Sequence, residues 1–179
     1  GAVHAEPTIT AAAAARLITR PASATSVSVQ QSIRQAGAQD AEAISTLITG
    51  LLGYFVSEPE SEVVKPFLET LSPAATRERI DSGDFLCLVA EQDSRIQGVI
   101  ALRDGSHIYH LFVRSDAHRR GIARALWERV RSMSPARVFT VNSSLHAVPF
   151  YERLGFRAVE APLVTDGLEF VPMEYRNDS

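Results

Sequence analysis

Residues 108–127 constrain the fold of this chain more than any other part of its sequence. Residues 108–113 form a mostly apolar run that is typical of a buried strand, residues 114–120 form a polar loop, and Gly121 opens an amphipathic helix. A strand, a short loop and a helix in this order place the first free N–H groups of the helix where a bound phosphate would lie. The helix dipole adds partial positive charge there, and a glycine allows close approach of the backbone.

The charge distribution agrees with an anion site in this segment. Residues 114–137 contain seven arginines against one aspartate and one glutamate, a net charge of +5, whereas the whole chain has a formal charge of −3. An alternative is a solvated, arginine-rich helix face, because the chain contains 17 arginines and one lysine. The sequence has neither Gly-x-x-x-x-Gly-Lys nor Gly-x-Gly-x-x-Gly, which excludes the common nucleoside triphosphate and dinucleotide loops. The remaining interpretation is another pyrophosphate ligand.

Length and hydrophobic patterning predict one α/β domain. A chain of 179 residues with 45% hydrophobic and 22% charged residues has a globular composition. We expect residues 1–26 to be a flexible or processed tail, because they are rich in Ala, Ser, Thr and Pro without lasting periodicity, and residues 27–179 to form the domain. No apolar run is long enough to span a membrane, and the single cysteine fits a reducing compartment, so we expect a cytoplasmic protein.

The order of predicted elements favours a mixed sheet. Residues 27–34 alternate as a strand, 40–52 form a helix stopped by Gly53, and 58–80 contain two short helices separated at Ser72-Pro73. Short, turn-rich connections join strands 85–90, 96–102 and 107–113, which predicts an antiparallel meander. Helix 121–133, strand 137–141, helix 145–154, strand 156–159 and strand 169–175 follow. A meander followed by β-α-β-α-β is a layered α/β arrangement whose sheet changes character in the middle.

Two motifs resemble those of the GNAT superfamily of acetyl-CoA-dependent N-acetyltransferases. The run from His118 to Ala123 resembles its Gln/Arg-x-x-Gly-x-Gly/Ala signature, with histidine in the first place, and Ser115 stands where proline is common. Residues 147–156, Ala-Val-Pro-Phe-Tyr-Glu-Arg-Leu-Gly-Phe, resemble the second motif, Ala-x-x-Phe-Tyr-x-x-x-Gly-Phe. The resemblance covers about residues 27–175 and implies a GNAT-like sheet with splayed central parallel strands.

The same resemblance implies where acetyl-CoA would bind. The strand ending in residues 111–113 would present free backbone groups to the pantetheine arm, and the loop and helix start would hold the pyrophosphate. The implied cofactor residues are Leu111, Phe112, Val113, His118, Arg119, Arg120, Gly121, Ile122, Ala123 and Arg124. Asn142 and Ser144 follow the next strand and are further candidates for the cofactor arm, although Ser143 or Ser144 is also suited to cap a helix.

Tyr151 and His110 are the candidate catalytic residues. Tyr151 in the second motif is implied to protonate the departing CoA thiolate, against the alternative of a core aromatic residue. His110 is the first candidate for the base, since an ordinary histidine pKa near 6.5 suits neutral pH, against the alternative of a histidine bonded within the sheet. An offset of three residues places His107 and His110 on opposite strand faces, so we expect no metal site. Cys87 in an apolar strand is expected to be a core thiol.

These observations lead to two hypotheses of different classes. The first is acetyl transfer from acetyl-CoA to a primary amine of a small molecule, an amino acid or a peptide. The second is a non-catalytic acyl-CoA sensor or interaction module. Glutamates 58, 60, 62 and 69, near Tyr54 and Phe55, lie where the family borders its acceptor site and would attract a cationic amine, or are simply solvated. No aromatic platform accompanies the arginines, which disfavours nucleic acid binding, and a homodimer remains open.

Overall fold

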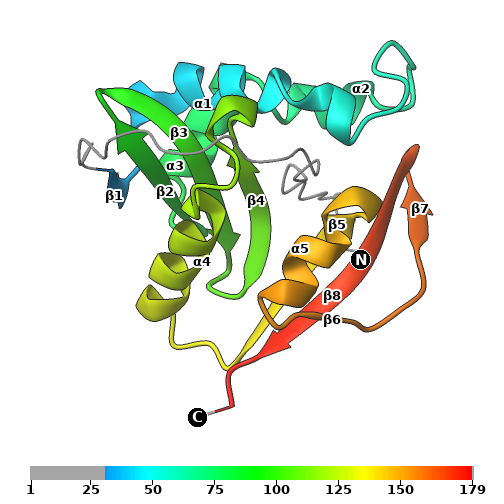
Figure 1. Cartoon of the computed structure of the whole chain (residues 1–179). Coiled ribbons are helices and arrows are strands. Elements are labelled where there is room, and N and C mark those ends of the chain that lie inside the picture. Colours follow the sequence, from blue (N-terminus) through cyan, green and yellow to red (C-terminus); the bar gives the residue numbers. More distant parts are fainter. Residues whose placement is uncertain (1–30, 179) are drawn as a thin grey trace, which may run out of the picture.

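The computed structural model describes residues 31–178, which form a mixed sheet flanked by helices (Figure 1). The hydrogen-bonded strand order is β1-β2-β3-β4-β5-β8-β6, and β7 pairs with β8. The strands are β1 Ser32–Gln35, β2 Phe85–Gln92, β3 Arg95–Arg103, β4 His107–Val113, β5 Val138–Ser144, β6 Arg157–Ala158, β7 Leu163–Thr165 and β8 Leu168–Arg176. The α-helices are α1 Ala41–Thr49, α2 Lys65–Glu69, α3 Pro73–Asp81, α4 Ile122–Met133 and α5 Val148–Arg153.

The antiparallel meander β2-β3-β4 is confirmed. Its two turns centre on Asp93-Ser94 and Asp104-Gly105, and all four residues have positive φ between 50° and 72°. Two successive left-handed residues are typical of type I′ hairpin turns, whose twist matches that of the flanking strands.

The middle of the sheet opens between β4 and β5. These parallel strands pair only at His107↔Thr140 and Ile108↔Val141, and then diverge toward their carboxyl ends (Figure 1). The predicted splayed pair of central parallel strands is therefore confirmed. On the far side, β5 pairs with β8 along its whole length, from Val138↔Arg176 to Ser144↔Phe170.

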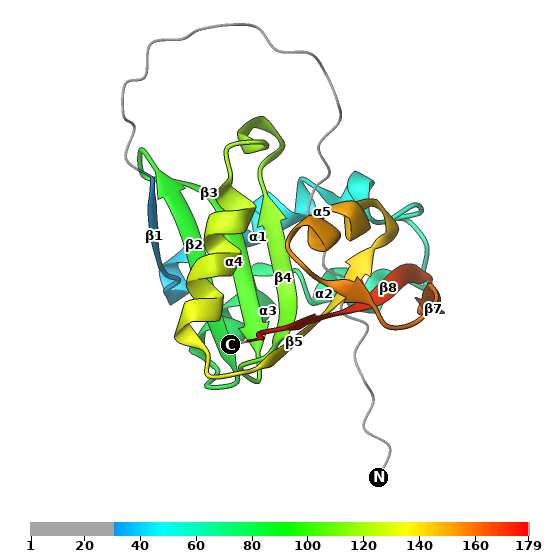
Figure 2. The ribbon, with the colours of Figure 1, turned by 60° about the horizontal axis from the view of Figure 1, so that its bottom comes forward.

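Two hydrophobic clusters cover the two faces of the sheet. One cluster contains Leu126, Trp127 and Val130 of α4 together with residues of α5, and the other contains residues of α1 and α2. Figure 2 shows α4 crossing one face of β2, β3 and β4, with α1 behind these strands. The amphipathic helix predicted to begin at Gly121 is confirmed, and its apolar side is buried.

Several predicted boundaries are wrong. Helix 40–52 ends before Gly50, and a separate 3-10 turn, Leu52–Tyr54, follows it. Helix 145–154 begins as a 3-10 turn, Leu145–Ala147, because the Ser144 hydroxyl accepts a hydrogen bond from the Ala147 amide there. Periodicity did not predict the three-residue strand β7. Of the predicted strand 27–34, the structure describes only the end, and the expected tail lies outside the described residues.

Candidate active site

A β-bulge in β4 sets the direction of the side chains next to the opening. Ala101 pairs with His110 and Leu102 with Ile108, which leaves Tyr109 as the additional residue. Ile108 and Leu111 consequently pack in the same hydrophobic cluster although they are three residues apart. An offset of three in this strand therefore does not place side chains on opposite faces, and the argument that separated His107 from His110 is wrong.

The carboxyl-terminal half of β4 has backbone groups that face the opening. The Arg114 amide donates to the Gln97 carbonyl of β3 at 2.8 Å. Because hydrogen-bonded positions alternate along an antiparallel pair, the backbone groups of Leu111 and Val113 point away from β3 and toward β5. Pairing with β5 ends at Ile108, so β5 does not use these groups.

His118 closes the loop after β4 back onto the strand. Its Nε2 lies 2.9 Å from the Val113 carbonyl oxygen. A carbonyl can only accept, so this Nε2 carries the proton and donates it. The histidine at the first position of the signature therefore holds the loop against the end of β4.

The loop reaches α4 through two left-handed residues. Arg119 has φ +65° and Gly121 has φ +75°, and Gly121 is the N-cap of α4. No side chain caps this helix, and a Cβ placed on Gly121 would meet no atom within 4 Å. The first N–H groups of a 12-residue helix are therefore accessible to an anion.

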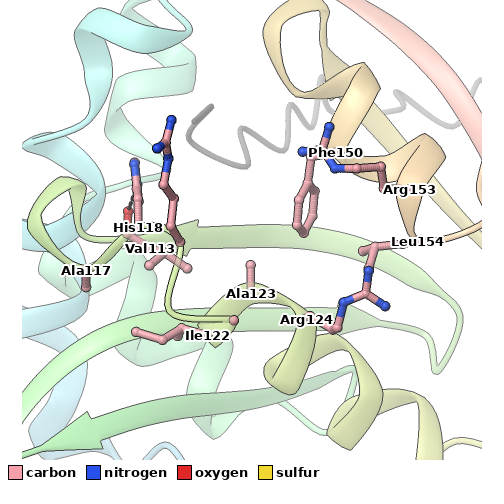
Figure 3. Close-up of a pocket in the computed structure, with 11 residues that line it drawn as sticks. Val113, Ala117, His118, Ile122, Ala123, Arg124, Phe150, Arg153 and Leu154 are labelled. Carbon is pink, nitrogen blue, oxygen red and sulfur yellow. Dashed lines mark hydrogen bonds between the residues drawn. The ribbon is translucent and has the colours of Figure 1, made fainter. Parts of the chain in front are cut away.

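A pocket of about 250 Å³ lies at this helix start, between α4 and α5 (Figure 3). We call it the arginine pocket, because Arg119, Arg124, Arg153 and His118 line it, and no acidic side chain of the described residues does. Its other lining residues are Val113, Ala117, Gly121, Ile122, Ala123, Phe150 and Leu154. Backbone donors and three guanidinium groups beside an apolar wall suit a ligand with a pyrophosphate and a thin organic arm.

The arginine pocket includes seven of the twelve predicted cofactor residues, and the other five do not line it. Leu111 and Phe112 are fully buried, which leaves their backbones as the available parts. Arg120 lines a different surface hollow with Asp93 and Asp116. Asn142 is half-buried in β5.

Sequence reasoning missed four residues of the arginine pocket. Ala117 belongs to the loop, whereas Phe150, Arg153 and Leu154 come from the segment of α5. Positions i, i+3 and i+4 share one face of a helix. This spacing in the second motif could have identified the last three.

A second pocket, of about 350 Å³, lies beyond the carboxyl end of β5. It is lined by three segments, namely residues 53–57 after α1, residues 144–146, and Val164, Gly167 and Glu169 of the β7–β8 hairpin. We call it the carboxylate pocket, because among residues 31–178 Glu169 is its one acidic lining residue and no lysine or arginine lines it. Glutamates 58, 60, 62 and 69 do not line it, and Glu62 forms an exposed ion pair with Lys65 at 2.7 Å.

Tyr151 lies in α5 and is fully buried. Its ring packs edge-on against Phe150 at 5.2 Å and Phe156 at 5.3 Å between centroids. Phe150, the preceding residue, lines the arginine pocket. Tyr151 itself lines neither pocket, so its place beside the thioester stays a prediction.

His110 occupies a different environment from the one expected. Its ring packs against Tyr109 at 4.5 Å and Phe112 at 5.4 Å, and it lines neither pocket. Burial, helped by the positive charge of Arg79, holds the pKa of His110 well below the usual histidine range. The expectation of an ordinary pKa near 6.5 is wrong, because it ignored the desolvation of a strand in the middle of the sheet.

Cys87 is buried in β2, where burial raises the pKa of its thiol to about 11. Its expected role as a core thiol is confirmed. Across residues 31–178, no three His, Cys, Asp or Glu side chains are grouped to hold a metal ion. No helix in the same stretch has the length and apolar character to cross a membrane.

Sequence comparison identifies the family of the chain. The model of the acetyltransferase (GNAT) domain family matches residues 55–177. The peptidyl-lysine N-acetyltransferase YiaC of Escherichia coli is 32% identical over 73 residues, which span 40% of this chain and half the length of YiaC.

Solved structures agree on the fold. A GCN5-related N-acetyltransferase from Rhodopseudomonas palustris superposes with a TM-score of 0.67 at 21% identity, covering 86% of this chain and 99% of that one. PaiA N-acetyltransferase from Thermoplasma acidophilum, solved in complex with coenzyme A, also gives 0.67, at 19% identity over 82% of this chain and 99% of its own. With most of the described residues inside the family match and the sheet arranged as in these structures, the chain belongs to the GNAT family of acetyltransferase domains.

Proposed function

We propose that this chain transfers an acetyl group from acetyl-CoA to a primary amine of a small molecule, an amino acid or a peptide. The observation that carries the proposal is the arginine pocket, where an uncapped helix N-terminus and three arginines meet at the end of a strand with free backbone groups. The names of relatives support it, since PaiA was solved with coenzyme A and YiaC is named for acetylation of peptidyl-lysine.

The residues present fit acetyl-CoA, which supplies the acetyl group as an activated thioester when bound. The first N–H groups of α4, with Arg119 and Arg124, would hold the pyrophosphate, and Arg153 would add a charge from α5. The backbone groups of Leu111 and the backbone amide of Val113, whose carbonyl already accepts from His118, would pair with the amide groups of the arm. Arg120, Asn142 and Ser144 do not line the arginine pocket, and a contact of theirs with the cofactor stays a prediction.

Two protons must move during the reaction. We assign the first to Tyr151, whose Oη would donate a proton to the leaving thiol sulfur. The second leaves the attacking amine, and His110 stays a prediction for that step. Its burial disfavours the imidazolium form, so water or a carboxylate near the acceptor is the competing route.

An acceptor screen tests the proposed function. The chain would be incubated with acetyl-CoA and a panel of monoamines, diamines, amino acids and lysine peptides, and free thiol would be measured over time. We expect thiol release that depends on one class of amine, with the acetylated product identified by mass spectrometry. Tight acetyl-CoA binding without turnover of any amine would favour the non-catalytic sensor instead.

A further inference from the structure

The carboxylate pocket carries an inference about the acceptor, and this inference rests on the proposed function. We propose that the acceptor has a second positive charge, separated from the reacting amine by a short aliphatic segment, and that Glu169 binds this second charge. The acceptor class is thus a diamine, or a longer amine with the same spacing of charges.

The hairpin places Glu169 at a fixed position in the pocket. Val164 and Glu169 are paired directly across β7 and β8, and both line the pocket. The turn between the strands is formed by Asp166 and Gly167, with φ of +50° and +75°. Leu168, which precedes the glutamate, is buried in the core. The exposed carboxylate is therefore attached to an anchored strand.

The charges around the pocket leave Glu169 available to a ligand. Within residues 31–178, Glu169 forms no ion pair, although Glu174 on the same strand is paired with Arg176 at 2.6 Å. In the part of the chain that the structure describes, no arginine or lysine lines the carboxylate pocket. A cationic group from a ligand would thus be the first strong partner of this carboxylate.

Apolar side chains in the same pocket suit an aliphatic segment. Tyr54, Leu145 and Val164 line the pocket and are 46%, 47% and 69% exposed. Methylene groups of a ligand would cover this apolar surface and remove it from water. The pocket therefore combines one anionic anchor with a hydrophobic wall.

Glu169 is better suited to a second charge than to the reacting amine. Acetyl transfer requires a neutral amine with a free electron pair. A neighbouring carboxylate favours the protonated form of an amine and raises its pKa. An ammonium held at the carboxylate would be a poor nucleophile, so the nitrogen that reacts should be the other one.

The experiment compares 1,4-diaminobutane with butylamine, which differ by one amino group. Both would be assayed at pH 8 with the wild type, Glu169→Gln and the control Glu78→Gln. Glu78 is exposed on α3 and lines neither pocket. For the wild type we expect a KM for the diamine about tenfold below that for butylamine, as for a charge-assisted contact.

We expect Glu169→Gln to remove that advantage, raising the KM for the diamine about tenfold and leaving kcat and the KM for butylamine unchanged. Equal KM values for both amines, or no effect of Glu169→Gln, would overturn the inference and leave the proposed function standing. If neither amine were acetylated, the proposed function would fail for small amines. The inference would then be decided by calorimetry with the diamine, and equal affinity of wild type and Glu169→Gln would overturn it.

Discussion

The arginine pocket and the carboxylate pocket lie beyond the carboxyl ends of the same two parallel strands, yet they carry opposite charge. Three arginines and an uncapped helix N-terminus surround the first. One glutamate and no basic residue other than His146 characterise the second. The divergence of β4 and β5 creates room for ligands there, and the side chains determine which ligand enters on each side. We therefore assign the first pocket to a pyrophosphate and the second to a cation.

The largest expected effect comes from charge placed at the start of α4. Gly121→Glu should reduce acetyl-CoA affinity by about 10³-fold or more, because a carboxylate opposes the phosphates and a non-glycine residue is strained at φ +75°. The fold should survive, since a Cβ there meets no atom within 4 Å. Calorimetry provides the measurement, and Gly121→Gln, of equal size, separates charge from strain. Affinity within a few-fold of wild type would place the phosphate site elsewhere.

Removing the Tyr151 hydroxyl should slow the chemistry without weakening binding. For Tyr151→Phe we expect kcat to fall roughly 10²-fold, the scale of general-acid assistance, with acetyl-CoA affinity within a few-fold of wild type. The buried ring keeps its packing, so the variant should fold. Tyr175→Phe, which loses a hydroxyl bonded to Arg131, is the matched control. An unchanged kcat would mean that Tyr151 is a core residue only.

The stability of the folded chain should depend on pH through His107, which lies where β4 and β5 are still paired. His107 Nδ1 lies 2.8 Å from the Thr140 hydroxyl, where β4 and β5 pair, and burial lowers the pKa of His107 to about 4. As pH falls, the unfolded chain, in which the histidine pKa is near 6.5, binds the proton before the folded chain does. The contribution of His107 to the free energy of unfolding is therefore complete above about pH 6.5 and is lost toward pH 4. Its maximum is about 3 kcal/mol.

Denaturant unfolding of wild type and His107→Gln between pH 4 and 8 would measure this contribution. We expect the difference between the two in unfolding free energy to become smaller as pH falls. A difference that stays constant with pH would show that the histidine is not kept neutral by the fold.

The smallest expected effect is a loss of acetyl-CoA affinity, without a change in the KM for the amine, on removing the charge of Arg153. Arg153→Gln should weaken acetyl-CoA binding about tenfold, less at high salt, because it removes one guanidinium from the arginine pocket. The KM for the amine should not change, since Arg153 does not line the carboxylate pocket. Arg77→Gln, on the exposed side of α3, is the control. A change in the KM for the amine alone would reverse our assignment of the pockets.

The two pockets also differ in how far the sequence predicts them. Most residues of the arginine pocket lie in one continuous stretch, 113–124, whose strand, loop and glycine can be recognised in order. The carboxylate pocket is assembled from three segments that are distant in sequence. Glu169 lies in no motif, and only the pairing of β7 with β8 places it opposite Val164. Its role could not be inferred before the strands were paired.

Local irregularities explain the other failures. The apolar run between turn residues predicts β4 to the residue, but it does not reveal the bulge at Tyr109 that redirects the side chains. Composition likewise does not show that His110 lies between two aromatic rings in the centre of the sheet. Where the chain follows regular geometry, as in the hairpins of the meander, the sequence was sufficient to predict the strands and their antiparallel pairing.

The assignment of one ligand to each pocket is tested most directly by backbone amide NMR shifts during two titrations. Acetyl-CoA should shift the amides of residues 121–124 together with Leu111 and Val113, and leave Gly167 and Glu169 almost unchanged. 1,4-Diaminobutane, added to the chain saturated with coenzyme A, should shift the amides of residues 167–169 and 53–57 instead. Shifts at Glu169 on adding acetyl-CoA, with none at Gly121, would contradict the account.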